Sequence, residues 1–248
     1  MKRTLAIILV FLLSLSLLSC GSSGVLERDK EYEIESEINS LDIEINAADF
    51  KIEYGERLAV TSNLKYLSVK EEGGTLKIVD EAPPHTGYTD AELTIQIPVG
   101  KVYEKISIDT GAAKLTVDEL FAKELCLNIG AGDAEIGYLE ASAAASIECG
   151  AGAIEVECGD LNDLSLNLGA GKANIGAVLL GESQLECGVG ELNLKFFGGE
   201  FNYKINAERG IGSITVDGEK MDGSGSYGDG ENTVNINGGI GAINISFD

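Results

Sequence analysis

The sequence predicts an all-β fold, a single-stranded β-helix or β-solenoid with rungs of about 19–20 residues, and three observations support this. A Gly-x-Gly unit returns along the second half of the chain at steps of 19, 20, 19, 19, 22 and 29 residues. The residues on both sides of each unit alternate between apolar and polar, which is the period of half-buried strands. A repeat of this length cannot bury its apolar side alone, so neighbouring rungs must stack.

The recurring glycines mark one corner of each rung. Glycine suits a stacked corner because the turn needs positive φ, or because neighbouring backbones come too close for a Cβ atom. The glycines expected to be structural are Gly111, Gly130, Gly132, Gly150, Gly152, Gly169, Gly171, Gly188, Gly190, Gly210, Gly212, Gly239 and Gly241.

Each rung is expected to hold one strand before the glycine corner and one after it, followed by a wider corner. The inward positions before the corner are apolar at equivalent places, as in Ile108, Leu127, Ile147, Leu166 and Leu185. After the corner they are Val117, Ile136, Val156, Ile175, Leu194, Val216 and Ile245. Outward residues predict two cross-rung ion pairs, Lys114 with Asp133 and Lys172 with Glu191, each worth little on a wet surface.

The part of the chain before Val102 repeats less regularly. Residues 41–45 and 50–54 form a rung without glycine at its corner, and residues 67–70 and 76–79 flank Gly73-Gly74 as a hairpin does. Residues 93–98 read as a further strand that Pro98 ends. Residues 81–90 and 217–231 are expected to be loops, and the second accounts for the 29-residue step.

The N-terminus carries an export signal. Lys2 and Arg3 precede an apolar run from Leu5 to Leu18, which is too short to span a membrane, and Cys20 follows with Gly-Ser-Ser behind it. This pattern resembles a bacterial lipobox, in which Cys20 is diacylated and becomes the mature N-terminus. We therefore expect a signal peptide over residues 1–19, the lipidated Cys20 with a polar tether over residues 20–39, and a β-solenoid domain over residues 40–248.

Composition limits the partners of the exported part. Without Lys2 and Arg3, the 18 basic and 41 acidic residues become 16 and 41, a formal charge of −25. This balance argues against nucleic acid and against direct adsorption to an anionic leaflet. We expect a bacterial membrane protein that is held by its lipid anchor, with its domain on the extracytoplasmic side.

Four cysteines remain besides Cys20. Cys149 and Cys187 share an inward column but stand two rungs apart, ~10 Å by strand spacing. A disulfide needs Cα atoms closer than about 7 Å, so we expect buried free thiols instead. Cys126 falls on an outward position and Cys158 near a wide corner. The chain has no CxxC motif and a single histidine, His85, so neither a metal site nor a cofactor is expected.

The outward columns contain the carboxylates that a catalytic site or a calcium site would need. Glu135 and Glu155 are neighbouring carboxylates, but no Lys or Arg occupies the adjoining rungs of their column, and a solvated acidic strip is the better interpretation. The position after each corner is acidic in two of seven copies, which excludes a repeated calcium stack. The acidic segment at residues 217–231 leaves a single Ca²⁺ site open.

The C-terminal rung suggests a contact surface. The middle corner residue grows along the chain from alanine to Val189, Ile211 and Ile240, and residues 234–247 are expected to close the stack with no cap. Self-association or docking of a partner at Ile211 and Ile240 is the hypothesis; folding back of residues 217–231 as a cap is the competing one. Arg209 falls on an inward position, so a bulge is expected to turn it outward, or it contacts an anion or partner.

Three stretches carry a resemblance to a family: Leu93-x-Ile95-x-Ile97-Pro98, Ile106-Ser107-Ile108 with Gly111 behind it, and the glycine rungs. From about Leu41 to Phe247 the chain resembles the bacterial putative-adhesin family of β-strand repeat proteins, a family of unknown function. The resemblance implies a β-helix exposed at the bacterial envelope.

These observations favour a non-enzymatic surface lipoprotein that acts as an adhesin or binding scaffold for an unknown protein or glycan. An accessory protein of an envelope-stress or export system, acting on membrane partners, is the alternative. A carbohydrate-active enzyme is the weaker third class, because the sequence lacks a basic cluster beside its carboxylates.

Overall fold

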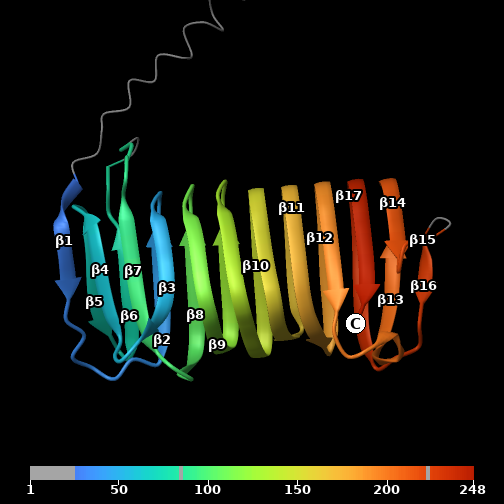
Figure 1. Cartoon of the computed structure of the whole chain (residues 1–248), viewed down its shortest axis with the longest axis horizontal. Helices are drawn as coiled ribbons and strands as arrows, with labels where there is room; N and C mark the ends of the chain where they lie inside the picture. Colours follow the sequence, from blue (N-terminus) through green and yellow to red (C-terminus); the bar gives the residue numbers. More distant parts are fainter. Residues whose placement is uncertain (1–25, 84–85, 222–223) are drawn as a thin grey trace, which may run out of the picture.

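The computed structural model describes residues 26–83, 86–221 and 224–248, which form one long β-sheet folded into two walls (Figure 1). We call the segments before each glycine corner the first wall and those after it the second wall. The strands are β1 (Leu26–Tyr32), β2 (Ser40–Ile45), β3 (Asp49–Gly55), β4 (Ala59–Leu64), β5 (Leu67–Glu72), β6 (Thr75–Asp80), β7 (Glu92–Pro98), β8 (Val102–Thr110), β9 (Lys114–Ile129), β10 (Asp133–Asn162), β11 (Leu164–Leu180), β12 (Glu182–Phe196), β13 (Tyr203–Glu208), β14 (Ile211–Val216), β15 (Glu219–Lys220), β16 (Gly225–Tyr227) and β17 (Asn232–Phe247), with a 3-10 helix, η1 (Glu200–Asn202), before β13. The predicted all-β class is confirmed.

Neighbouring rungs pair in parallel with their corners in register. Gly152 pairs with Gly171, Gly171 with Gly190, and Gly190 with Gly241. The alternating pattern therefore places the predicted inward residues in continuous columns between the walls, where apolar burial stabilises the stack. The buried columns include Ile108, Leu127, Ile147, Leu166 and Leu185 of the first wall and Val117, Ile136, Val156, Ile175 and Leu194 of the second.

The rungs do not stack in sequence order at either end. β17 lies between β12 and the rung of β13 and β14, because Ile236 pairs with both Leu185 and Ala207. At the other end, β2 pairs with both β6 and β8, so the rung of β2 and β3 lies inside that of β6 and β7. The expectation that residues 234–247 form the open end is therefore wrong. β17 has the same alternation of inward apolar residues as the other rungs, so it can stack on either neighbour. Its internal position gives its backbone hydrogen-bonding partners on both sides.

Antiparallel strands cover both ends of the walls. β5 pairs with β6, while β4 pairs with β7 and β1 with β4. At the opposite end β16 pairs with β13 and β15 with β14, and Tyr227 of β16 stacks on Phe247 with ring centroids 6.0 Å apart. The segment expected to be a loop over residues 217–231 thus contains two strands, and the capping interpretation is the one the structure favours. Strand β1 also falls within the expected tether, so pairing with β4 makes the folded part begin before Ser40.

Close backbone approach explains the glycine corners. A Cβ atom on Gly152 would lie 1.9 Å from the carbonyl oxygen of Gly132, and one on Gly150 would lie 2.6 Å from that of Gly130. Positive φ applies to only some of them, since values of 146°, 149° and 146° occur at Gly171, Gly190 and Gly241. Stacking distance is therefore the constraint that the corners share.

We predict that Gly152→Ala lowers the free energy of unfolding by at least about 1–3 kcal/mol. The added methyl group would overlap a backbone oxygen, and this oxygen cannot move unless the whole rung shifts. Gly150→Val and Gly169→Val have the same direction, since their Cβ atoms would lie 2.6 Å and 2.5 Å from carbonyl oxygens. Urea denaturation measures the effect. The control is Gly225→Ala, whose added Cβ meets nothing closer than the Met221 methyl carbon at 3.8 Å. Equal stability of Gly152→Ala and the control would contradict the stacking argument.

Candidate binding face

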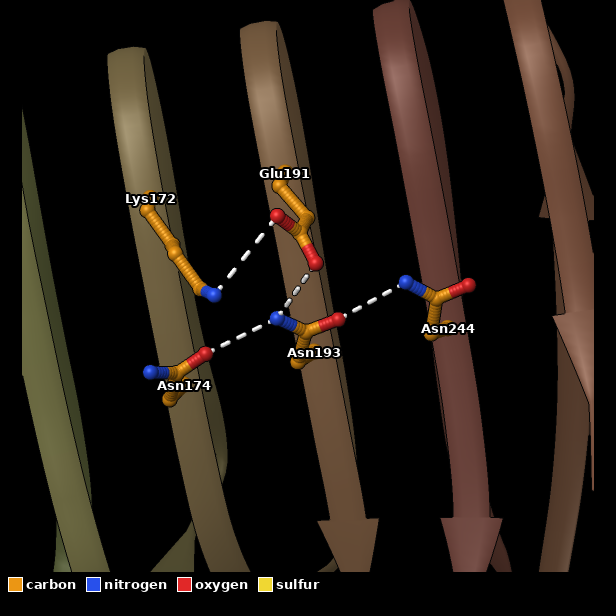
Figure 2. Close-up of polar contacts among 5 residues, drawn as sticks. All are labelled: Lys172, Asn174, Glu191, Asn193 and Asn244. Atoms are coloured by element: carbon orange, nitrogen blue, oxygen red, sulfur yellow. Dashed lines mark hydrogen bonds and ion pairs between the residues drawn. The ribbon is translucent and has the colours of Figure 1, made fainter.

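A row of asparagine side chains runs across the outer face of the second wall. Asn174, Asn193 and Asn244 stand at equivalent outward positions on β11, β12 and β17, which are neighbours in the stack. The Asn193 Nδ2 donates to Asn174 Oδ1 at 2.8 Å, and the Asn244 Nδ2 donates to Asn193 Oδ1 at 2.8 Å (Figure 2). Thr215 Oγ1 of β14 extends the row by donating to Asn244 Oδ1 at 2.9 Å. We call these four residues the asparagine row.

Charged side chains flank the row on the corner side. The Lys172 Nζ lies 3.6 Å from Glu191 Oε2, as the sequence predicted, and Glu191 Oε1 accepts from Asn193 Nδ2 at 2.9 Å (Figure 2). These groups are about half exposed, so the ion pair adds ~1 kcal/mol at most. The main effect of the pair is geometric: Lys172 positions the Glu191 carboxylate, and Glu191 holds the Asn193 carboxamide in the orientation that the row requires.

The second predicted ion pair is wrong in its partner. Lys114 Nζ lies 3.8 Å from Glu135 Oε1, whereas Asp133 Oδ1 accepts the backbone N–H of Ala153 at 3.1 Å. Both carboxylates sit on the next rung, and Asp133 is already satisfied by the backbone. A cation therefore does reach the Glu135 and Glu155 column, although from the neighbouring column.

The asparagine row forms the floor of a groove of about 520 Å³. Besides the row, its lining includes Glu155, Glu157, Gly176, Lys195 and Ser246. A second hollow of about 430 Å³ continues toward the N-terminal rungs and is lined by Asp118, Glu119, Glu135, Glu155 and Glu157. The sequence-predicted carboxylate pair thus lies in an acidic section of one extended polar face.

Two tyrosines, one on β3 and one on β10, are hydrogen-bonded to carboxylates. The Tyr54 hydroxyl donates to Glu119, and desolvation, together with this hydrogen bond, raises the pKa of Tyr54 to about 12. The Tyr138 hydroxyl donates to Asp160, and this bond, with desolvation, raises the pKa of Tyr138 as well. Both phenols stay protonated at neutral pH, so they act as hydrogen-bond donors and supply no nucleophile.

Potential metal ligands do not converge in the described ranges. No group of three or more His, Cys, Asp or Glu side chains there is placed to hold a metal ion. Cys126, Cys149, Cys158 and Cys187 are all free thiols, as expected from the two-rung separation of the inward pair. Within those same ranges, no helix is long and apolar enough to cross a membrane.

The residues predicted to make contacts lie at the glycine corner and not on the asparagine row. Ile211 and Ile240 are 75% and 51% exposed on neighbouring rungs, and Arg209 is exposed as expected. Its backbone N–H donates to Ser224 Oγ at 3.0 Å. Cys20, the predicted lipidation site, lies outside the described residues.

The asparagine row was not predicted from the sequence. In chain order, Thr215 separates Asn193 from Asn244, and only the return of β17 into the stack makes the three asparagines adjacent. The 29-residue step was the one signal of this rearrangement, and it is equally compatible with a long loop.

The family follows from a comparison of the sequence with known families. Residues 32–238 match the family model described as Toastrack DUF4097. The chain belongs to this family. The matched range covers the strands from β2 to β16 and the first half of β17. Asn174, Asn193 and Thr215 of the row lie within it, whereas Asn244 and the last glycine corner lie beyond its end. No curated protein matches the chain.

Several solved structures resemble this Toastrack chain. A putative adhesin from Bacteroides fragilis is 12% identical with a TM-score of 0.44, over 88% of this chain and 95% of that one. A putative cell adhesion protein from Clostridium sporogenes is 18% identical with a TM-score of 0.32, over 89% and 99% of the two chains. A putative lipid binding protein from Parabacteroides distasonis is 19% identical with a TM-score of 0.38, over 88% and 96%.

We predict that Asn193→Ala destabilises the protein by about 1–2 kcal/mol, because it removes the middle of the row and leaves Asn174, Asn244 and Glu191 each without one partner. Asn167→Ala is the matched control, since Asn167 is an exposed outward residue of β11 on the first wall. Chemical denaturation of both variants measures the difference. A loss for Asn193→Ala no larger than for the control would show that the row is not cooperative.

The cysteines give a second prediction for this region. Cys158 is exposed, Cys126 is half-buried, and Cys149 and Cys187 are buried; desolvation raises the pKa of both buried thiols. Iodoacetamide should therefore alkylate Cys158 first and Cys126 more slowly, while Cys149 and Cys187 react only after unfolding. Mass spectrometry of the native and denatured protein reads this order. A disulfide between Cys149 and Cys187 in the native protein would contradict the register.

Proposed function

We propose that this Toastrack protein is a non-enzymatic, lipid-anchored β-solenoid on the extracytoplasmic side of a bacterial membrane, and that it binds a protein or glycan partner on the outer face of its second wall. The observation that carries the proposal is the asparagine row, a hydrogen-bonded floor in a groove of about 520 Å³. Adhesion is the first form of this role. Assistance to an envelope-stress or export system is the second.

The row supports binding because its hydrogen-bonding capacity is ordered but incomplete. A carboxamide has two donor hydrogens and two acceptor lone pairs. Asn193 uses both of its donor hydrogens, on Asn174 and Glu191, but each of the three carboxamide oxygens accepts one bond within the row and keeps a second lone pair. These remaining acceptors repeat at the strand spacing of ~4.8 Å along the face. Such an array suits an extended polar partner, because the partner's hydroxyl or amide groups can form hydrogen bonds with successive residues of the row.

The neighbouring charges favour partners with some cationic character. Asp118, Glu119, Glu135, Glu155 and Glu157 line the hollow beside the groove, and the exported part of the chain has a formal charge of −25. A neutral glycan can lie over the row itself, while a basic peptide segment would extend across the acidic hollow. The same field repels anionic polymers such as nucleic acid.

The binding proposal is tested by filling the groove without touching the row. Ser246 is exposed and lines the groove, so Ser246→Trp should remove most partner recovery in a cross-linking pull-down from intact cells. Ser165→Trp is the matched control, because Ser165 is exposed on the first wall. Recovery of the same partner with Ser246→Trp as with the control would refute the groove as the binding face.

The anchor is tested separately. Cys20→Ala removes the thiol that would carry the acyl chains, and a single chain binds a bilayer only weakly whereas two hold a protein stably. We expect the variant to lack acyl chains, to lose normal processing before residue 20 and to be depleted from the membrane fraction. Normal processing and full membrane retention of Cys20→Ala in cell fractionation would overturn the lipoprotein proposal.

A further inference from the structure

The tips of the glycine corners form one continuous row of apolar side chains, which we call the corner ridge. Parallel pairing places Ala151 beside Ala170, Ala170 beside Val189, and Val189 beside Ile240, which in turn pairs with Ile211. In the order of the stack, the ridge consists of Ala112, Ala131, Ala151, Ala170, Val189, Ile240 and Ile211, all exposed. Its three large members are 52%, 51% and 75% exposed and occupy neighbouring rungs.

The last two rungs of the ridge have no charge just after the tip. The position two residues after the tip carries Lys172 on the rung of Ala170 and Glu191 on the rung of Val189, but Ala242 and Ser213 on the rungs of Ile240 and Ile211. Arg209 is exposed beside this end and adds a cation, next to the exposed carboxylate of Glu208. In a chain that is otherwise strongly acidic, this combination of an apolar strip and one cation is suited to a lipid surface, where side chains enter the acyl boundary and arginine meets phosphate.

The folded chain begins at the same edge as the ridge. β4 runs antiparallel to β7, with Ser62 opposite Leu93 just after the corner, and Leu26 of β1 pairs with Leu64 two residues further along. Figure 1 accordingly shows β1 starting at the upper edge, where the glycine corners of β12, β17 and β14 also lie. Only five residues separate Leu26 from Cys20, and an extended chain of that length reaches ~20 Å.

We propose that the corner ridge is a membrane-contact surface, on which Val189, Ile240 and Ile211 enter the outer part of the leaflet and Arg209 binds lipid phosphate. The proposal rests on the lipid anchor at Cys20 and adds a second contact at the opposite end of the stack. The two contacts are about ten strand spacings apart, roughly 45–50 Å. Together they hold the solenoid lengthwise on the membrane, with the wide corners outward and the asparagine row facing sideways.

Two alternatives are weaker on the same observations. The opposite edge also exposes large apolar residues, Val99, Val102, Leu180 and Phe201, but these are divided between two separate places in the stack and lie away from the edge where Leu26 begins. Association of two copies through their ridges would bring two strongly acidic molecules together. A dimer formed through the ridges would also bury the surface that the proposed lipid anchor holds near the bilayer.

The test places a fluorophore at each edge of the lipidated mature protein. In a chain with Cys126→Ser and Cys158→Ser, a bimane label is attached at Ile240→Cys or, as the matched control, at Leu180→Cys. The protein is reconstituted into zwitterionic phosphatidylethanolamine–phosphatidylcholine vesicles that contain a headgroup-near doxyl lipid, because the acidic chain would be repelled by an anionic leaflet. We expect several-fold stronger quenching at position 240 than at position 180. Adding Ile211→Lys should weaken quenching at position 240, whereas Val99→Lys should not.

The outcomes separate the ridge from the anchor. Flotation of the protein with the vesicles, but equal quenching at positions 240 and 180, would overturn the ridge proposal and leave the anchor standing. Failure of the protein to float would refute the anchor, on which the ridge proposal rests, and so refute both. Lipid-independent self-quenching of the label at position 240, with a dimer in light scattering, would replace the membrane by a second copy of the chain.

Discussion

The spacing between stacked glycine corners is the constraint on which the rest of the structure depends. Each corner lies so close to the next that a Cβ on Gly152 or Gly171 would stand 1.9 Å or 2.0 Å from a carbonyl oxygen of the rung before it. A rung that satisfies this contact cannot slip along its neighbour, because a shift of one residue would bring a side chain into the same space. The corners therefore fix the register, and the register forms the inward columns.

A fixed register also turns single residues into rows on the outside of the walls. The outward position of Asn174 is repeated by Asn193 and Asn244, and their carboxamides come within 2.8 Å of one another only because the rungs are aligned. The corner ridge has the same origin. Repetition therefore supplies extended surfaces of uniform chemistry, which suits contact with long or planar partners better than chemistry at one point.

The sequence predicted what is repeated and missed the order in which the repeats stack. Alternation and glycine spacing identified the inward columns, the free thiols at Cys149 and Cys187, and the Lys172–Glu191 pair, because these depend on local periodicity. They did not reveal that β17 enters between β12 and β13, since every rung offers the same pattern to either neighbour. Lys114 was assigned to Asp133 for a related reason: a column predicts which rungs meet, but not which of two nearby carboxylates a flexible lysine reaches.

The internal position of β17 links the ends of the stack to its corners. With β17 inside, the end rung is β13 and β14, and the antiparallel strands β15 and β16 can cover the edges of both walls. These caps shield the unpaired backbone groups through which open sheets aggregate. They do not extend over the corner itself, where Ile211 stays 75% exposed on the last rung beside Ile240. The end rung therefore combines partly covered sheet edges with an uncovered apolar corner, which separates protection against self-pairing from a surface available for contact. In the membrane-contact proposal, the start of β1 at the same edge would direct that corner toward the bilayer.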